Sequence, residues 1–228
     1  MSTSTSTSRA DILGNIRRSL HVTGTERPRV SVVAERLAQS PQGPIPARGQ
    51  LDHEAQVELF KQEAERIFAS VVDVASVQDV PAEVARFLRE ANLPATLRMG
   101  SDPRLAAMPW TDTALALTQG RSDGDDLNAI SHAFAGIAET GTLALVSGAD
   151  NPTTLNFLPD NHIVVIAAKD ITGDLESVWA RLRTFQGKGE MPRTVNLITG
   201  PSRSGDIEQT MLLGAHGPRR LHIVIVRD

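Results

Sequence analysis

The stretch Gly200–Pro218 (GPSRSGDIEQTMLLGAHGP) gathers small, polar and charged residues between two apolar runs, at 194–199 and 221–226. Both runs are typical of buried strands. A loop that follows a strand and opens a helix presents unpaired backbone N–H groups, which favour anions. The sequence therefore predicts an anion-binding site at a strand's carboxyl end. The residues predicted to form it are Gly200, Ser202, Arg203, Asp206 and His216.

Within this stretch, a short helical turn is expected to open at Asp206, with Gln209 as its capping-box partner. Ile207, Thr210 and Met211 would share one face of the turn, and Gly214 would end it. An ordinary strand–helix connection without a ligand is the alternative interpretation, because short loops of this kind are common.

A second polar group, Ala138–Thr142 (AETGT), surrounds a glycine between two apolar runs. This pattern predicts a tight hairpin that turns at Thr140-Gly141. A carboxylate such as Glu139 is costly among apolar neighbours unless it is paired or used. Glu139 is thus either a catalytic nucleophile or a structural carboxylate bonded to turn amides. Thr140, Gly141 and Thr142 are predicted to bind ligand beside it.

Other polar residues allow fewer predictions. Arg98 precedes Gly100-Ser101 and is a second strand-end cation for a ligand, or else a surface arginine bridging to a helix. The histidines do not have metal-ligand spacing, so no metal site is predicted. The dinucleotide, P-loop, esterase and zincin motifs do not occur, and neither does a flavin motif that can be named.

The elements that must position these residues alternate from position 51 onward. Helices are expected at 52–70, 76–91 and 175–186, with a helical turn at 102–107. Strands are expected at 71–74, 95–99, 114–118 and 163–167, and 128–134 is a further short segment. This order predicts an α/β fold with a mostly parallel sheet.

The first fifty residues differ in composition from the rest. Residues 1–8 are low-complexity and predicted to be disordered, and 9–20 form an amphipathic helix. Residues 21–50 are rich in Pro, Gly and Arg and predict a linker with a helical turn near 32–37. The arm 9–50 is expected to dock on its own body or on a partner, and the domain proper to span 51–228.

Charge and composition limit the partners, cofactors and location that can be expected for this chain. Residues 1–50 carry seven arginines and three acidic residues, within a chain whose net charge is −4. A basic arm on an acidic body suggests contact with an acidic protein surface, and without lysine clusters or interleaved aromatics it does not indicate nucleic acid. With 0 cysteines, the chain cannot hold an iron–sulphur cluster through its own thiolates. No segment resembles a membrane span or a signal peptide, so a cytoplasmic location is expected.

The two polar motifs together carry a family resemblance. Gly200–Pro218 and Ala138–Thr142, with Asn156-Phe157-Leu158-Pro159 before an apolar run, resemble the signature of the lactate-utilisation (LUD) domain family. The resemblance covers the last ~130 residues and extends more loosely back to position 51. It implies a three-layer α/β domain like that of sugar-phosphate isomerases and CoA transferases. Glu139-Thr140-Gly141 also looks similar to the short turn that carries the nucleophilic glutamate of CoA transferases.

The resemblance implies a subunit of an L-lactate-oxidising complex, with lactate going to pyruvate and iron–sulphur clusters on two partner proteins. No cofactor is expected in this chain itself. The alternative is a stand-alone enzyme or ligand-binding module for a small anionic carboxylate, phosphate or CoA ester, which would use a pocket formed by Glu139 and Arg203. Co-purification with cluster-bearing partners, against turnover by the isolated chain, distinguishes the two.

Overall fold

The computed structural model describes residues 4–187, 189–205 and 211–228. The chain divides into two compact units, Met1–Gly43 and Pro44–Asp228. The first unit contains helices α1 (Ser4–Ser19) and α2 (Arg27–Gln39). In the described part of the chain, neither unit has a helix with the length and apolar character needed to cross a bilayer.

A helix was expected at 9–20, and α1 spans Ser4–Ser19, so the prediction of disorder for residues 1–8 is corrected from Ser4 onward. The interpretation of 21–50 as a linker with one helical turn is corrected, because α2 spans thirteen residues. Pro28 lies in the first turn of α2, where its fixed φ suits a helix start and its missing N–H costs nothing. Large apolar side chains of both helices, including Ile12, Ile16 and Leu37, are exposed.

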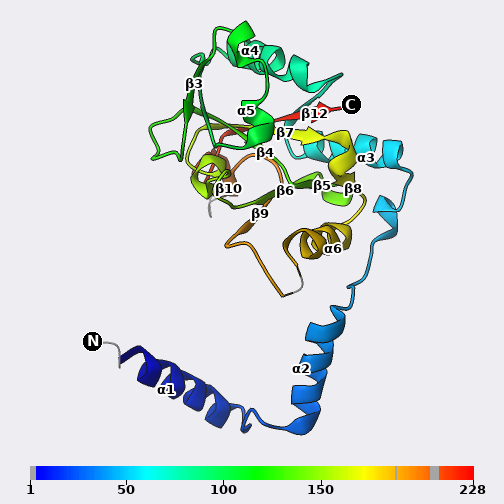
Figure 1. Cartoon of the computed structure of the whole chain (residues 1–228), viewed down its shortest axis with the longest axis vertical. Helices are drawn as coiled ribbons and strands as arrows, with labels where there is room; N and C mark the ends of the chain where they lie inside the picture. Colours follow the sequence, from blue (N-terminus) through cyan, green and yellow to red (C-terminus); the bar gives the residue numbers. More distant parts are fainter. Residues whose placement is uncertain (1–3, 188, 206–210) are drawn as a thin grey trace. The chain divides into compact units, whose positions relative to one another are not determined.

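The second unit (Figure 1) follows the predicted alternation of strands and helices closely. Its helices are α3 (His53–Arg66), α4 (Val80–Glu90), α5 (Pro103–Ala106) and α6 (Leu175–Gln186). Its strands are β1 (Ser70–Val74), β2 (Thr96–Met99), β3 (Ala116–Gln119), β4 (Asn128–His132), β5 (Ala135–Ile137), β6 (Thr142–Val146), β7 (Asn161–Ala167), β8 (Ile171–Thr172), β9 (Val195–Ile198), β10 (Arg203–Gly205), β11 (Met211–Leu213) and β12 (Arg220–Val226).

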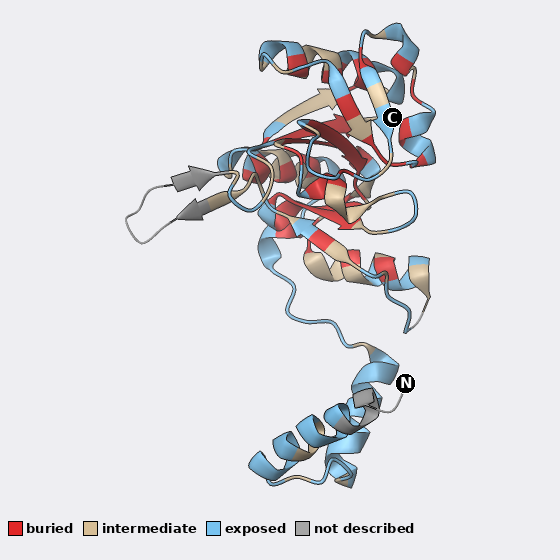
Figure 2. Ribbon diagram, turned by 90° about the vertical axis from the view of Figure 1, so that its left-hand side faces the viewer, coloured by how far each residue is buried: buried red, intermediate tan, exposed pale blue. Residues whose placement is uncertain are grey.

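The larger sheet has six strands in the order β1-β12-β7-β4-β2-β3, and every pair in it is parallel. This confirms the predicted α/β class with a mostly parallel sheet. Its central strands, β12, β7 and β4, are almost entirely buried (Figure 2). Strands β7 and β12 read as continuous apolar runs because helices and a second sheet cover both of their faces.

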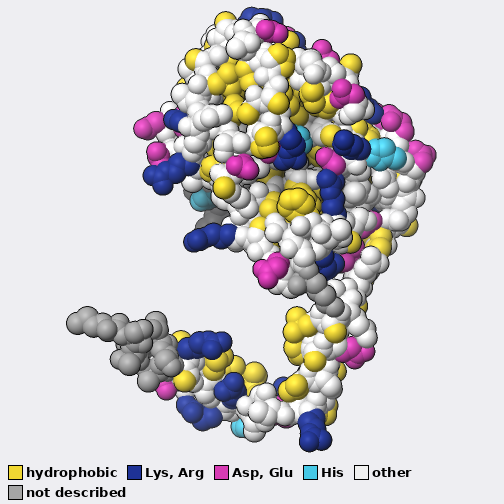
Figure 3. Space-filling view, in the orientation of Figure 1, with side chains coloured by type: hydrophobic (Ala, Val, Ile, Leu, Met, Phe, Trp, Pro, Cys, Tyr) yellow, Lys and Arg dark blue, Asp and Glu magenta, His cyan; other side chains and the backbone are white. Residues whose placement is uncertain are grey.

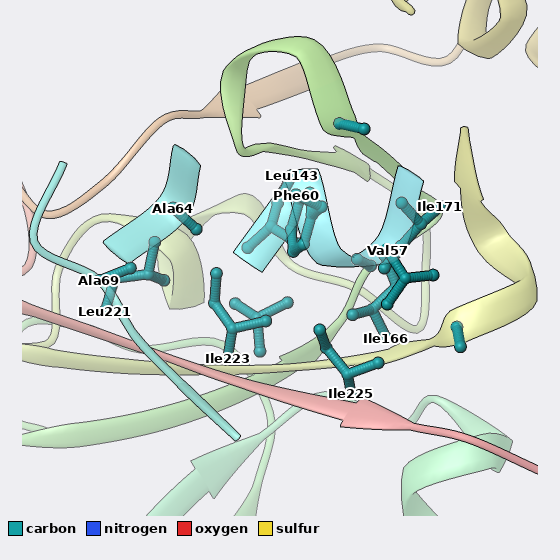
Figure 4. Close-up of a cluster of buried hydrophobic side chains, with 14 of the residues drawn as sticks. Val57, Phe60, Ala64, Ala69, Leu143, Ile166, Ile171, Leu221, Ile223 and Ile225 are labelled. Carbon is teal, nitrogen blue, oxygen red and sulfur yellow. The ribbon is translucent and has the colours of Figure 1, made fainter. Parts of the chain in front are cut away.

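Each face of the six-stranded sheet has its own core. On one face, α3 and the β5–β6 hairpin pack against β7 and β12, and Figure 4 shows Val57, Phe60 and Ala64 of α3 facing Ile223 and Ile225. On the other face, α4 and the segment from α5 to β3 pack against the same strands. A smaller sheet, β8-β5-β6-β9, lies beyond the first core, and α6 covers its outer side. Short strand β8 was not predicted from the sequence.

The hairpin at Ala138–Thr142 is confirmed, but its turn is longer than expected. Ile137 pairs with Thr142, and Ala138–Thr140 forms a 3₁₀ turn rather than part of a strand. Gly141 closes this turn in the left-handed region, with φ 62°. A Cβ at Gly141 would lie 2.3 Å from the backbone nitrogen of Ala64 in α3. The turn therefore packs directly on the helix backbone, which only glycine permits.

The segment after α6 differs most from the prediction. The run at 194–199 forms β9, but β9 pairs antiparallel with β6 at the rim of the smaller sheet, and Leu197 is exposed. Met211 belongs to β11, which pairs with β10, and not to a helix. Asp206 and the rest of the expected helical turn, 206–210, lie outside the described residues.

Residues 47–50, predicted to be part of the linker, belong to the second unit and pack on its helices. Arg48 forms an ion pair with Glu63 of α3, and the Gln50 side chain donates to Asp174 Oδ2 at 3.0 Å. Asp174 is also the N-cap of α6, where its side chain accepts from the backbone N–H of Ser177. These contacts join the start of the domain to both α3 and α6.

A buried hydrogen bond connects α4 to the start of β12. Glu83 accepts from His222 Nε2 at 3.1 Å and from Arg86, and the ring of Phe87 stacks on His222. Burial alone would raise the pKa of Glu83. The hydrogen bonds from His222 and Arg86 outweigh it and lower that pKa from 4.5 to about 2.

We predict that Gly141→Val lowers the free energy of unfolding by on the order of 2–4 kcal/mol, because it combines backbone strain with a clash against α3. Denaturant unfolding monitored by circular dichroism measures the effect. Gly148→Ala is the matched control, since a Cβ at Gly148 meets nothing within 4 Å. A Gly141→Val variant as stable as the parent would contradict the described turn.

We predict that Glu83 makes the protein acid-sensitive. Because its pKa is lower in the folded state, its contribution to stability is present above pH ~4.5 and is lost as the pH falls towards 2. Unfolding free energies measured from pH 7 to pH 2.5 should fall for the parent by on the order of 3 kcal/mol through this group. Glu83→Gln should remove this contribution to the pH dependence of the unfolding free energy. Glu90→Gln, which alters an exposed partner of the same arginine, should keep it.

Candidate functional site

The predicted Gly200–Pro218 motif forms one wall of a cavity of about 340 Å³, which we call the loop cavity. Residues 199–203 and 216–218 form that wall, and the rest of the lining is Asn156, Phe157, His162, Leu197, Ile198 and Leu221. Four of the residues predicted to bind an anion are therefore brought together: Gly200, Ser202, Arg203 and His216.

The loop cavity lies at the amino edge of the six-stranded sheet. His162 and Leu221 are near the first residues of β7 and β12, so the cavity opens at the amino ends of these parallel strands. The sequence predicted a site at the carboxyl end of the strand at 194–199, and residues 197–199, at that end of β9, also line the cavity. Strand β9 belongs to the smaller sheet, and the loop that follows it crosses the amino edge of the larger one.

Backbone hydrogen bonds hold the two halves of the loop together. Ser202 N donates to Pro218 O at 2.8 Å, and Ser202 Oγ accepts from His216 N at 3.3 Å. Gly200 has φ 78°, and a Cβ there would lie 2.7 Å from the carbonyl oxygen of Ile67. The loop is thus seated against the residue that ends α3, and glycine is required at the contact.

Arg203 supplies a positive charge to the loop cavity. Its guanidinium carbon lies 3.2 Å from the ring centroid of Phe68, which fixes the planar group against an aromatic face. Its Nε is buried and donates to no atom in the described part of the structure. A buried N–H without an acceptor is costly, so this donor is suited to an anionic group that enters the cavity.

His162 adds an acceptor to the loop cavity. Its Nε2 lies 3.0 Å from Ser131 Oγ, and that hydroxyl donates to Asn156 Oδ1 at 3.1 Å. Since the hydroxyl proton goes to Asn156, the imidazole proton sits on Nε2, and Nδ1 carries a lone pair. Nδ1 is buried and has no partner among the residues described. Burial lowers the pKa of His162 to about 3, so the ring is neutral at pH 7.

The sequence placed His162 correctly at the start of a strand but assigned it no role. Asn156 was noted only as part of the family resemblance. One signal in the sequence could have identified His162: it is a polar residue directly before the apolar run 163–167. A histidine buried at the start of a strand needs a hydrogen-bond partner.

The Ala138–Thr142 motif contacts the wall of the loop cavity but does not line the cavity itself. Thr142 Oγ1 lies 2.8 Å from Thr140 Oγ1 and 2.8 Å from Thr199 Oγ1, and Thr199 lines the cavity. Glu139, Thr140, Gly141 and Thr142 are not lining residues. The hydroxyl chain therefore supports the cavity wall from behind, where it connects β6 to the end of β9.

Glu139 is directed towards a helix. The carboxylate is buried, and its Oε1 accepts from the backbone N–H of Leu175 at 3.1 Å, the first residue of α6. A carboxylate at a helix N-terminus satisfies an unpaired donor and complements the helix dipole. This geometry corresponds to the structural alternative for Glu139 rather than to a nucleophile facing a substrate.

Arg98 does not line the loop cavity. Its Nε donates to Asp126 Oδ1 at 2.9 Å, and Asp126 lies in the loop before β4, so this bond does not bridge to a helix. Asp206 lies outside the described residues. Within the described ranges, no group of three or more His, Asp or Glu side chains is arranged to hold a metal ion.

Comparisons with known proteins agree with the family resemblance. The chain is 38% identical over 93 residues to a lactate utilization protein C from Geobacillus sp. (strain WCH70), which covers 40% of this chain and 39% of that protein. A lactate utilization protein C from Exiguobacterium sp. (strain ATCC BAA-1283 / AT1b) is 28% identical over 182 residues, 75% of this chain and 78% of that protein. The match thus spans about two fifths of the length of the first relative.

A solved structure shares the fold. It is that of a DUF162 family protein from Deinococcus radiodurans, with a TM-score of 0.56 and 21% identity, and the match covers 77% of this chain and 99% of that one. The model of the LUD domain matches residues 57–226, which contain both polar motifs. The chain belongs to the LUD domain family.

Proposed function

We propose that this protein is a subunit of a cytoplasmic system that oxidises L-lactate to pyruvate together with two iron–sulphur proteins. The observation that carries this proposal is the similarity to proteins named lactate utilization protein C, which in one case extends over 75% of the chain. The sequence contains 0 cysteines, so the thiolate-held clusters of such a system belong to the partners.

The first unit supplies the means of assembly in this proposal. Helices α1 and α2 expose their apolar side chains and carry six arginines between residues 9 and 36, with three acidic residues. An exposed apolar stripe flanked by arginines fits an acidic partner protein with an apolar groove, since arginine is enriched at protein interfaces.

We propose further that the loop cavity binds a small α-hydroxy acid, with lactate as the first candidate. The supporting observation is that two residues lining the same cavity each have a buried polar atom without a partner among the described residues: Arg203 Nε, a donor, and His162 Nδ1, an acceptor. An α-hydroxy acid carries the complementary pair, a carboxylate that accepts from Arg203 and a hydroxyl that donates to His162.

The alternative of a stand-alone enzyme built on Glu139 and Arg203 receives less support. Only Arg203 lines the loop cavity, and the Glu139 carboxylate accepts from the start of α6. The proposal therefore assigns binding to this chain and assigns no covalent step to Glu139.

We predict that Arg203→Ala weakens lactate binding about tenfold or more, because it removes a charge-assisted hydrogen bond worth ~1.5–3 kcal/mol. Isothermal titration of the full chain with lactate, pyruvate and inorganic phosphate measures the affinities, and thermal melts verify folding. Arg121→Ala, at an exposed arginine outside the cavity, is the matched control.

The same variants then enter a reconstituted complex, in which lactate-dependent electron transfer is recorded. Arg203→Ala should reduce the rate at low lactate, whereas Glu139→Gln keeps an acceptor for Leu175 N and should leave the rate nearly unchanged. Loss of activity in Glu139→Gln with unchanged melting would support the enzyme alternative. An unchanged lactate affinity in Arg203→Ala would show that the loop cavity is not the lactate-binding site.

We predict that deleting residues 1–43 leaves a folded second unit but weakens association with the iron–sulphur partners by about tenfold or more. Size-exclusion chromatography and affinity titration against the purified partners measure this effect. Substituting Ile12, Ile16 and Leu20 together by serine in the full chain tests the apolar stripe alone. A truncated chain that assembles as tightly as the parent would show that the arm has another role.

A further inference from the structure

A second and larger cavity lies at the other edge of the six-stranded sheet. It measures about 960 Å³, and we call it the strand-end crevice. Asp102 and Arg104 at the start of α5 form one side, His132 and Phe134 after β4 form the floor, and Arg181 and Phe185 of α6 form the other side. Its volume falls in the range of about 300–1,000 Å³ that is typical of small-molecule and cofactor sites.

The crevice occupies the place where open α/β sheets bind ligands. Strands β2 and β4 are neighbours, but the chain leaves them in opposite directions. After β2 it turns to α5, whose Leu105 packs in the core on one face, and after β4 it turns to Ala133, which packs in the core on the other face. Diverging connections open a gap beyond the carboxyl ends of the two strands, and ligands bind in such gaps.

Two arginines at the crevice are each held by a carboxylate and keep N–H donors that bond to no residue in the described ranges. Arg104 Nε donates to Asp102 Oδ1 at 3.0 Å and its Nη2 to Oδ2 at 2.6 Å, so that its Nη1 remains available. Arg181 Nη2 donates to Asp170 Oδ1 at 2.7 Å, and its guanidinium carbon lies 4.8 Å from the ring centroid of Phe134. Guanidinium groups fixed on one edge and free on the other are suited to phosphate oxygens.

The carboxylates at the crevice are already occupied by protein donors. Buried Asp102 accepts from Arg104 and from Asn151 Nδ2 at 3.1 Å. Burial acts to raise the pKa of Asp102, but the hydrogen bonds from Arg104 keep it below its ordinary value. Asp150 accepts from Ser101 Oγ at 3.1 Å. The arginine donors are therefore the groups left over for a ligand.

His132 offers an acceptor at the floor of the crevice. Its Nδ1 lies 2.8 Å from Ala133 O, so Nδ1 carries the proton and Nε2 the lone pair. Burial and the neighbouring Arg104 lower the pKa of His132, which keeps the ring neutral. No residue in the described ranges bonds to Nε2. A hollow of about 180 Å³ that shares Arg104 and His132 adds Lys169 to the same edge.

An exposed aromatic side chain completes the arrangement. Phe185 packs against Phe134 with ring centroids 5.6 Å apart, yet it remains 69% exposed. Figure 3 shows basic side chains gathered around an apolar patch on the face that carries α5 and α6. A free aromatic face beside fixed arginines can stack a planar ring while the arginines hold an anion.

We propose that the strand-end crevice binds a nucleotide: a phosphorylated ligand whose planar ring packs on Phe185 and whose phosphates contact Arg104 and Arg181. His132 Nε2 accepts from a hydroxyl or amine of the ligand. This site is distinct from the loop cavity, which lies at the amino ends of β7 and β12.

The experiment titrates the full chain separately with ADP, FMN, adenosine and inorganic phosphate by isothermal titration calorimetry. We expect ADP or FMN to bind more tightly than either adenosine or phosphate, because only they use both halves of the crevice. Arg181→Ala should weaken that binding about tenfold or more and should also weaken phosphate binding. Phe185→Ala should weaken binding of the ring-bearing ligand and leave phosphate binding unchanged.

The controls separate this proposal from the function proposed above. Arg183→Ala alters an exposed arginine of the same helix outside the crevice and should bind as the parent does. Arg203→Ala should lose lactate affinity but keep nucleotide affinity. The parent's failure to bind ADP or FMN at millimolar concentration, or equal affinities in Arg181→Ala and Arg183→Ala, would overturn the proposal. Equal affinities for phosphate and ADP would contradict the proposed contact between the planar ring of the ligand and Phe185.

Discussion

The structure depends on the insertion of β12 between β1 and β7. Three residues near the middle of β12, Ile223, Val224 and Ile225, are fully buried, and they contribute side chains to the cores on both faces of the sheet. Without β12, strand β1 would have no partner in the main sheet. The insertion also fixes where the preceding loop must pass, since residues 216–218 reach β12 only by crossing the amino edge of the sheet.

The two cavities follow from this topology. The loop cavity is closed by the chain on its way into β12, and its polar groups come from strand starts and from a loop. The strand-end crevice lies where the chain leaves β2 and β4 in opposite directions. One cavity is small and places Arg203 beside the neutral imidazole of His162, whereas the other is larger and combines two fixed arginines with an aromatic face. The difference in size and donors is why different ligands are assigned to them.

Much of the fold could be predicted from the sequence because long periodic segments specify their own structure. Helix α6 has the predicted bounds, and Asp52 caps α3 by accepting from Ala55 N. Strand partners are not encoded locally: the run at 194–199 predicted a buried strand, whereas β9 pairs at the rim of the smaller sheet and exposes Leu197. The site residues show the same limit. Glu139 finds its partner 36 positions away, and Arg104 and Arg181 share a crevice although 77 positions separate them.

Strand β4 connects the two cavities through neighbouring residues. The hydroxyl of Ser131 bonds to His162 at the loop cavity, while the next residue, His132, lines the strand-end crevice. Because alternate side chains of a strand point to opposite sides, one rigid segment of backbone serves both sites without a hinge. Thermodynamic linkage then requires reciprocity: if an occupant of one cavity changes the affinity of the other, the second changes the first by the same factor.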